Sequence, residues 1–316
     1  QALARVALAN TAEMLGQVDV LREECQKSQQ WLRRLGLQVV PSQANFCLFG
    51  RFADRHAVWQ QLYARQQALL PGRACDEFVR GMQDLPIGPD QIPNFEQLSE
   101  TLSQRTGWQI VAVPGLVPDE VFFDHLAHRR FPAGQFIRRP DQLDYLEEPD
   151  VFHDVFGHVP MLMHPVMAEF IQAYGQGGLR AKKEGVLDLL ARVYWYTVEF
   201  GLVRQPDGLR IYGAGIVSSA TESVFALEDA SPNRIGFELE RVMRTRYRID
   251  DFQETYFVLD NLDQLLALAH TDFDPVYARV TQERALVPGD VLPSDRVLTR
   301  GSGRYHAAKR NPENKP

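Results

Sequence analysis

Two histidines and one carboxylate stand in apolar, aromatic stretches of the chain, where ordinary core packing would not place them. His153 and His158 lie in Phe152-His-Asp-Val-Phe-Gly-His-Val-Pro160, and Glu199 lies in Tyr194-Trp-Tyr-Thr-Val-Glu-Phe-Gly201. A buried carboxylate without a partner loses several kcal/mol of hydration, and a bound cation would offset that loss. Two imidazoles and one carboxylate, with the other positions open, are the ligand set of non-haem Fe(II) oxygenases. The three residues are therefore candidate metal ligands.

The same residues also have plainer interpretations. A buried histidine is often a hydrogen-bonded core residue, and a glutamate on an apolar helix can pair with an arginine elsewhere. A site of two histidines and one glutamate could also hold zinc and a water molecule, as in hydrolases. However, Asp154 follows the first histidine, so the His-Glu-x-x-His motif of zinc proteases is absent. Spacing alone leaves the metal site and the structural interpretation equally open.

The elements that carry these residues are expected to be helical but not regular. A helix through Glu199 would place Trp195 and Val203 on the same face. His153 and His158 are five residues apart, which on a straight α-helix separates them by about 140°. Because Val159-Pro160 follows, we expect the helix to end or distort near Gly157 and His158.

Both blocks resemble signature sequences of the pterin-dependent aromatic amino acid hydroxylases. A third block, Ile211-Tyr-Gly-Ala-Gly-Ile-Val-Ser-Ser219, follows in the family's order, and the resemblance covers roughly residues 58–283. It is nearest to the bacterial members that act on phenylalanine. Three long blocks in order are more specific than any single motif. The resemblance implies the family's catalytic-domain fold, which is mainly α with short β pieces (α+β).

The resemblance also implies the reaction. It indicates a phenylalanine 4-monooxygenase that converts L-phenylalanine to L-tyrosine with O2, a tetrahydropterin and Fe(II), which His153, His158 and Glu199 would bind. A tryptophan or tyrosine hydroxylase is the alternative within the family, and a zinc-dependent hydrolase is the alternative outside it. Val258 stands where we expect the tyrosine-hydroxylating branch to carry Asp. Because Val offers a phenol hydroxyl no partner, this position favours phenylalanine.

Further site residues are assigned by the resemblance. The residues implied for the pterin site are Val113, Gly115, Leu116, Val117, Phe122, Ala191 and Tyr194. Those implied for the amino acid site are Arg138, Pro149, Trp195, Phe200, Gly215 and Ser218. Arg138 would bind the carboxylate through two parallel donors, and Ser218 would also orient a ligand histidine. Without the resemblance, the loop before Phe122 is a turn leading into a helix, and Ser218 is a turn serine.

Composition and charge narrow the class of protein. The chain has 316 residues, of which 45% are hydrophobic and 24% charged, and its net charge of −7 gives no electrostatic case for nucleic acid or an anionic membrane. Three widely spaced cysteines indicate reduced thiols, and no apolar run approaches a membrane span. We expect a cytoplasmic protein. No heptad run follows the catalytic block, so we expect a monomer.

Three segments are expected along the chain. Residues 1–57, with a helix to about residue 34 and strands over 35–40 and 44–49, resemble a fragment of the small domain of histidinol-phosphate aminotransferases, without the lysine that a transaminase needs. An unusual natural extension is the alternative. The catalytic segment is 58–283, with helices over 59–69, 94–106, 118–128, 168–174, 185–202, 234–244 and 262–269 and strands over 109–113 and 210–212. The Pro-, Gly- and charge-rich residues 284–316 are expected to be disordered.

Overall fold

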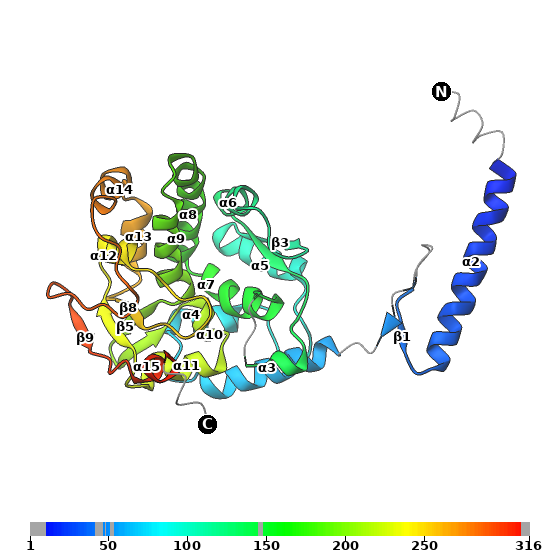
Figure 1. The fold of residues 1–316 in the computed structure, drawn as a ribbon, viewed down its shortest axis with the longest axis horizontal. Coiled ribbons are helices and arrows are strands. Elements are labelled where there is room, and N and C mark those ends of the chain that lie inside the picture. The colour runs from blue at the N-terminus through cyan, green and yellow to red at the C-terminus, as the bar shows by residue number, and fades with distance from the viewer. Residues whose placement is uncertain (1–10, 42–46, 48, 51–53, 145–147, 311–316) are drawn as a thin grey trace. The chain divides into compact units, whose positions relative to one another are not determined.

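The computed structural model describes residues 11–41, 47, 49–50, 54–144 and 148–310, and its fold is drawn in Figure 1. The chain forms two compact units, Gln1–Asp54 and Arg55–Pro316. In the first unit, helix α2 (Thr11–Arg34) precedes a pair of short antiparallel strands, β1 (Gln38–Val39) and β2 (Phe49–Gly50). The predicted helix over residues 1–10, and most of the second predicted strand, lie outside the described residues.

Helices make up most of the second unit. They include α3 (Arg55–Leu69), α4 (Asp76–Asp84), α5 (Phe95–Thr106), α6 (Asp119–Ala127), α8 (Pro165–Glu184), α9 (Leu187–Tyr194), α11 (Ala220–Glu228), α12 (Leu239–Arg244), α13 (Asp263–Ala269) and α14 (Asp274–Val280). The bounds of α5 follow from its caps: Asn94 Oδ1 accepts from the N–H groups of Glu96 and Gln97, and Gly107 ends the helix with a φ of 77°. Helices α8 and α9 run side by side through the middle of the unit (Figure 1).

Two sheets complete the second unit. Strand β3 (Gln109–Val113), at its predicted position, pairs in parallel with β4 (Arg130–Gly134), and α6 connects them. The larger sheet has the order β6 (Gly208–Ile211), β5 (Leu202–Gln205), β8 (Thr255–Leu259), β7 (Asn233–Gly236) and β9 (Val297–Thr299). Its three inner strands are parallel and its two outer strands antiparallel to their neighbours. Every residue of β8 is buried, as expected for a central strand.

The helix predicted over residues 234–244 is wrong in its first half. Asn233–Gly236 forms strand β7, which pairs with β8 on one side and β9 on the other. Helix α12 begins only after Glu238, whose carboxylate accepts from the N–H groups of Glu240 and Arg241. Strand pairing with two distant segments therefore overrides the local helical pattern.

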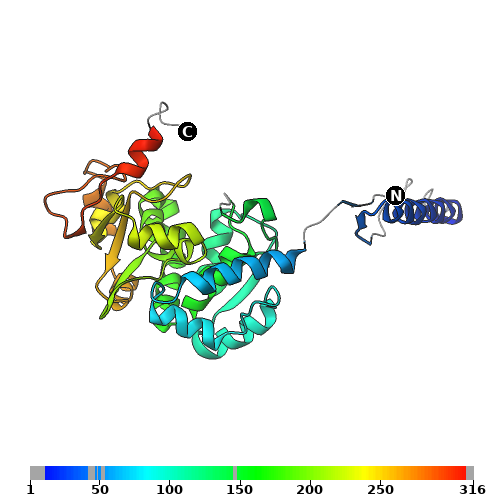
Figure 2. The same cartoon turned by 90° about the horizontal axis from the view of Figure 1, so that it is seen from below.

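The disorder predicted for the C-terminal segment is wrong for residues 284–310. Strand β9 pairs with β7, and helix α15 (Arg304–Arg310) packs beside α11 (Figures 1 and 2). A salt bridge of 2.8 Å joins Arg241 to Asp295, and both side chains are almost fully buried. The charges that suggested a solvated tail are thus paired with the folded unit. Residues 311–316 lie outside the described residues. Among the described helices, none is long and apolar enough to cross a membrane.

Candidate active site

Two π-helical segments carry the three candidate ligands. His153 and His158 lie in η2 (Phe152–His158), and Glu199 ends η3 (Trp195–Glu199). The i→i+5 hydrogen bonds of a π-helix bring residues five apart onto the same side, which a straight α-helix would not do. The predicted distortion is therefore present, but the helix does not end there: it continues as α7 (Val159–Leu162). π-Helical turns are rare and are frequently found at functional sites.

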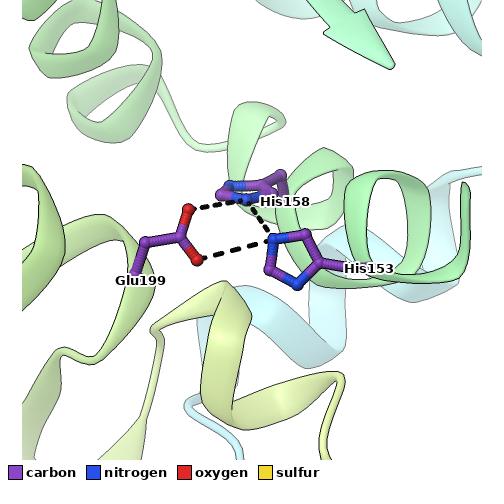
Figure 3. Close-up of side chains that lie close together, drawn as sticks. All are labelled: His153, His158 and Glu199. Carbon is purple, nitrogen blue, oxygen red and sulfur yellow. Dashed lines mark hydrogen bonds and ion pairs between the residues drawn. The ribbon is translucent and has the colours of Figure 1, made fainter. Parts of the chain in front are cut away.

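The ligand atoms face one another across a small gap, as Figure 3 shows. Glu199 Oε1 is 3.1 Å from His158 Nε2, and Glu199 Oε2 is 3.5 Å from His153 Nε2. The two Nε2 atoms are 3.2 Å apart. One ligand atom from each residue can thus be chosen so that all lie within 4.8 Å of one another. Two nitrogens and a carboxylate that converge on one point fit a bound divalent metal.

The protonation states also suit a metal. Burial lowers the pKa of His153 to about 4, so its imidazole is neutral at neutral pH, as a ligand must be. Burial acts to raise the pKa of Glu199, but His158, His153 and the N–H of Gly215 outweigh it and hold that pKa below its usual value. The site therefore presents a neutral imidazole at His153 and a charged carboxylate at Glu199.

The third sequence block supports both ligand segments. Helix α10 (Ala214–Val217) ends at Ser218, whose Oγ lies 3.0 Å from His153 Nδ1 and donates to Ala214 O at 2.7 Å. His153 Nδ1–H can thus donate to Ser218, which leaves Nε2 for the metal. A Cβ on Gly157 would lie 2.9 Å from Ala214 O, so only glycine lets η2 approach α10 this closely.

A buried ion pair fixes the arginine implied for carboxylate binding. Arg138 Nε and Nη2 donate to Oδ2 and Oδ1 of Asp150, both at 2.9 Å, and Asp150 is fully buried. Asp150 Oδ1 also accepts from the N–H of His153 at 3.0 Å. Burial acts to raise the pKa of Asp150, but Arg138 holds it below its usual value. Nε and one side of Nη2 are engaged by Asp150, so the Nη1–Nη2 edge of Arg138 is left available for a second partner.

Asp150 is a site residue that the sequence analysis missed. A signal for it exists, since an acidic residue directly before the apolar run Val151-Phe152 of the first block needs a buried partner. Nothing local identifies that partner as Arg138, which lies 12 residues earlier in the chain.

The structure brings all six residues implied for the amino acid site together. Arg138, Pro149, Trp195, Phe200, Gly215 and Ser218 line one cavity of about 490 Å³, together with His153 and Glu199. Trp195 stacks on Tyr247 with ring centroids 4.3 Å apart, and its Nε1 donates to Gln253 Oε1 at 3.1 Å. Val258 is buried in β8 and is not among the residues that line this cavity. Its effect on the choice between phenylalanine and tyrosine stays a prediction.

The residues implied for the pterin site are only partly brought together. The rings of Phe122 and Tyr194 are 6.3 Å apart, and Tyr194 lies 6.4 Å from the ring of His158. Val113 is buried at the end of β3, whereas Leu116 is 78% exposed. Gly115 lies close to Glu148: a Cβ there would be 3.0 Å from its carboxylate. The remaining two, Val117 and Ala191, are half-buried.

Asp154 adds a polar carboxyl group next to the metal site, near the residues implied for the pterin. Asp154 Oδ2 accepts from the N–H of Gly134 at 2.7 Å, and burial raises the pKa of Asp154 to about 7. With the faces of Phe122 and Tyr194, this carboxyl suits a flat heterocycle that has both π-faces and polar edges. The residues present thus fit a pterin.

Comparison with known proteins identifies similar sequences over most of the chain. Residues 51–272 match the sequence model of the family described as biopterin-dependent aromatic amino acid hydroxylase. Phenylalanine-4-hydroxylase of Ralstonia nicotianae is 63% identical over 250 residues, which cover 79% of this chain and 80% of the relative. Phenylalanine-4-hydroxylase of Caulobacter vibrioides is 61% identical over 253 residues, which cover 80% of this chain and 86% of the relative.

Solved structures show the same likeness. Phenylalanine hydroxylase of Chromobacterium violaceum bound to cobalt superposes with a TM-score of 0.76 at 57% identity, covering 78% of this chain and 89% of the other. The iron- and phenylalanine-bound structure of that enzyme superposes with a TM-score of 0.75 at 55% identity, covering 78% and 90%. These superpositions confirm the α+β fold expected for the catalytic unit.

Proposed function

The chain belongs to the biopterin-dependent aromatic amino acid hydroxylases, and we propose that it is a phenylalanine 4-monooxygenase that uses O2, a tetrahydropterin and Fe(II). One observation carries this proposal: His153, His158 and Glu199 converge beside a cavity that also contains a fixed arginine and aromatic walls. The ligand set leaves positions open on the iron, as an oxygenase requires. When bound, iron and pterin supply the activation of O2.

The cavity recognises both ends of an aromatic amino acid. The Nη1–Nη2 edge of Arg138 binds the carboxylate, since a guanidinium presents two parallel donors to such a group. Trp195, Phe200 and Pro149 surround the ring, and their apolar surfaces exclude water from it. The side chain of Trp195 is restricted to this conformation, because it stacks on Tyr247 and donates a hydrogen bond to Gln253. The protein thus places one ring carbon toward the iron and keeps the other atoms of the substrate still.

The pterin is proposed to bind beside His158. Phe122 and Tyr194 offer aromatic faces for stacking, and Asp154 offers a carboxyl that can accept a hydrogen bond from an amino-pyrimidine edge, directly or through water. The loop from Val113 to Val117 would close over the ring, with the exposed Leu116 able to cover it.

The metal requirement and the pterin requirement test the proposal together. The purified protein is expected to contain iron and to convert phenylalanine to tyrosine aerobically only when a tetrahydropterin is added. Metal analysis by mass spectrometry and chromatography of the amino acids measure both. Protein that holds zinc, makes no tyrosine and hydrolyses an ester or amide would contradict the proposal and support the zinc hydrolase instead.

We also propose that the enzyme is a cytoplasmic monomer. Its net charge of −7 disfavours binding to nucleic acid and anionic membranes, and no heptad run of a tetramerisation helix occurs in the sequence. Light scattering coupled to size-exclusion chromatography is expected to give the mass of one chain, and a dimer or tetramer would contradict this.

A further inference from the structure

The C-terminal helix α15 lies against a loop that forms part of the wall of the substrate cavity. Residues 248–253 of this loop line the cavity, and so do Tyr305 and Lys309 of α15. Glu199 and Arg138 line the same cavity. Nothing in the proposed chemistry uses α15, so its presence in this wall needs another explanation.

Two side chains of α15 converge on one carboxylate of the loop. Tyr305 Oη donates to Asp251 Oδ1 at 2.9 Å, and Lys309 Nζ donates to the same oxygen at 2.9 Å. Lys309 Nζ also lies 4.6 Å from the centre of the Tyr305 ring, a cation–π contact. Burial acts to raise the pKa of Asp251, but Lys309 and Tyr305 hold it below its usual value. Asp251 is therefore a charged anchor, with only 10% of its side chain exposed.

Other contacts attach α15 to the rest of the loop. His306 Nε2 lies 2.9 Å from the carbonyl oxygen of Phe252, within hydrogen-bond distance. The rings of Tyr305 and Phe252 are 5.3 Å apart, and Arg310 donates to both carboxylate oxygens of Glu254 at 2.7 Å. Helix α15 thus holds the side chain or backbone of three loop residues at once.

The loop in turn holds an aromatic wall of the cavity. Gln253 Oε1 accepts from Trp195 Nε1 at 3.1 Å, and Gln253 Nε2 donates to Arg248 O at 2.8 Å. Trp195 stands four residues before the ligand Glu199. A continuous set of contacts therefore runs from α15 through the loop to the side chain proposed to pack on the substrate ring.

We propose that α15 is a positioning element for the amino acid substrate: Tyr305 and Lys309 hold Asp251, and the loop of residues 248–254 thereby keeps Trp195 against the bound ring. The inference rests on the proposed hydroxylase function. It separates the two organic ligands, because Phe122 and Tyr194, proposed for the pterin, lie on α6 and α9. Their rings pack on each other and on Phe123, Tyr174 and His158. Loosening α15 should weaken amino acid binding and leave pterin binding unchanged.

Single substitutions in the full-length, iron-loaded protein test this. Asp251→Asn, Lys309→Met and the milder Tyr305→Phe weaken the anchor, whereas Lys309→Arg preserves its charge. Arg304→Gln is the matched control, since Arg304 is on the same helix and its side chain has no partner among the described residues. Asp251→Asn and Lys309→Met should each raise the phenylalanine KM by about three- to fivefold, the range of a partly exposed ion pair. The pterin KM and the iron content should stay at the wild-type level.

Hydrogen exchange gives a readout that does not depend on turnover. Backbone amides of residues 248–254 should exchange faster in Asp251→Asn and Lys309→Met, while Lys309→Arg and Arg304→Gln should match the wild type. An unchanged phenylalanine KM, an equal rise in both KM values, or unchanged exchange in the loop would each overturn the inference. Wild-type protein that makes no tyrosine would contradict the proposed function instead. Phenylalanine affinity from calorimetry would then take the place of KM in the same comparison.

Discussion

At the scale of single residues, Glu199 supplies the charge of the metal site. Glu199→Gln keeps the shape of the side chain but removes the negative charge that offsets Fe(II), so iron content and hydroxylation should both fall by at least about tenfold. Metal analysis and tyrosine formation measure the loss, and the thermal midpoint shows that the fold is retained. A variant with one iron per chain and full activity would remove Glu199 from the ligand set.

Arg138 has two tasks, because it pairs with buried Asp150 and is proposed to bind the substrate carboxylate. Lysine carries the charge but cannot serve two carboxylates through separate edges. Arg138→Lys should therefore raise the phenylalanine KM by at least about tenfold, with little change in the pterin KM. Steady-state kinetics with each substrate varied in turn decide this. Equal losses for both substrates would mean that Arg138 only supports the scaffold.

Glu222 gives the protein a pH dependence that is separate from the metal. It is buried on α11 and accepts from Tyr256 Oη at 2.6 Å, and burial raises its pKa from 4.5 to about 7. Between these values the unfolded chain is ionised and the folded chain still protonated. Folding therefore becomes less favourable as the pH rises from 4.5 to about 7, and above that range both states are ionised and the loss is complete.

Glu222→Gln should remove this loss. The free energy of unfolding of the variant, compared with that of the wild type, should rise from pH 5 to pH 8 by at most about 3 kcal/mol. Urea unfolding of both proteins at the two pH values measures the difference. A difference that does not change with pH would show that Glu222 is not the titrating group.

At the scale of elements, the close packing of η2 on α10 is the feature most sensitive to change. Gly157→Ala would place a Cβ 2.9 Å from a backbone oxygen of α10, which cannot rotate away as a side chain could. We expect a loss of about 1–3 kcal/mol of stability together with a lower iron content, since η2 carries both histidines. Gly88→Ala is the control, because a Cβ on Gly88 meets nothing within 4 Å. Equal midpoints for the two variants would contradict this role for the packing.

The sequence predicts elements well where their signals are local. Helix α5 and strand β3 occur at the expected residues, because a cap at Asn94 and a short, mostly β-branched apolar run over 109–113 define them within a few positions. Strands β4, β5, β7, β8 and β9 were missed, and each of them pairs with a segment far away in the chain. The tail was misjudged for the same reason: its charges find partners only after folding.

The residues of the candidate site also fall into those that the local sequence predicts and those that depend on distant contacts. Its three ligands follow from residue types and spacing together with the resemblance, whereas Asp150 and the loop of residues 248–254 act through contacts that spacing does not encode. The π-helical turn could be predicted only in part. A five-residue spacing signals an irregular helix, but the sequence alone does not decide whether it ends or widens.

At the scale of the whole molecule, the catalytic residues all belong to one of the two units. Every residue proposed for iron, pterin or substrate lies within Arg55–Pro316. The resemblance of the first segment to an aminotransferase fragment remains a prediction, and a segment of this size is near the floor of about 40 residues for unaided folding. Deleting residues 1–54 should therefore leave kcat and both KM values within about twofold of the full chain. A truncated protein that is insoluble and inactive would show that the first unit is an integral part of the enzyme.

Because η2 is π-helical, the direction of its two histidines depends on the number of residues between them more than on which residues these are. Removing one residue between His153 and His158 would give the four-residue spacing with which α-helical zinc proteases pair their histidines. Adding one would turn His158 away from Glu199. Substitutions can therefore adjust the surroundings of this metal site. Changing its histidine pair to the spacing of a regular α-helix takes an insertion or a deletion. In an alignment of distant relatives, a one-residue gap inside this block would therefore mark a different helix geometry at the metal site.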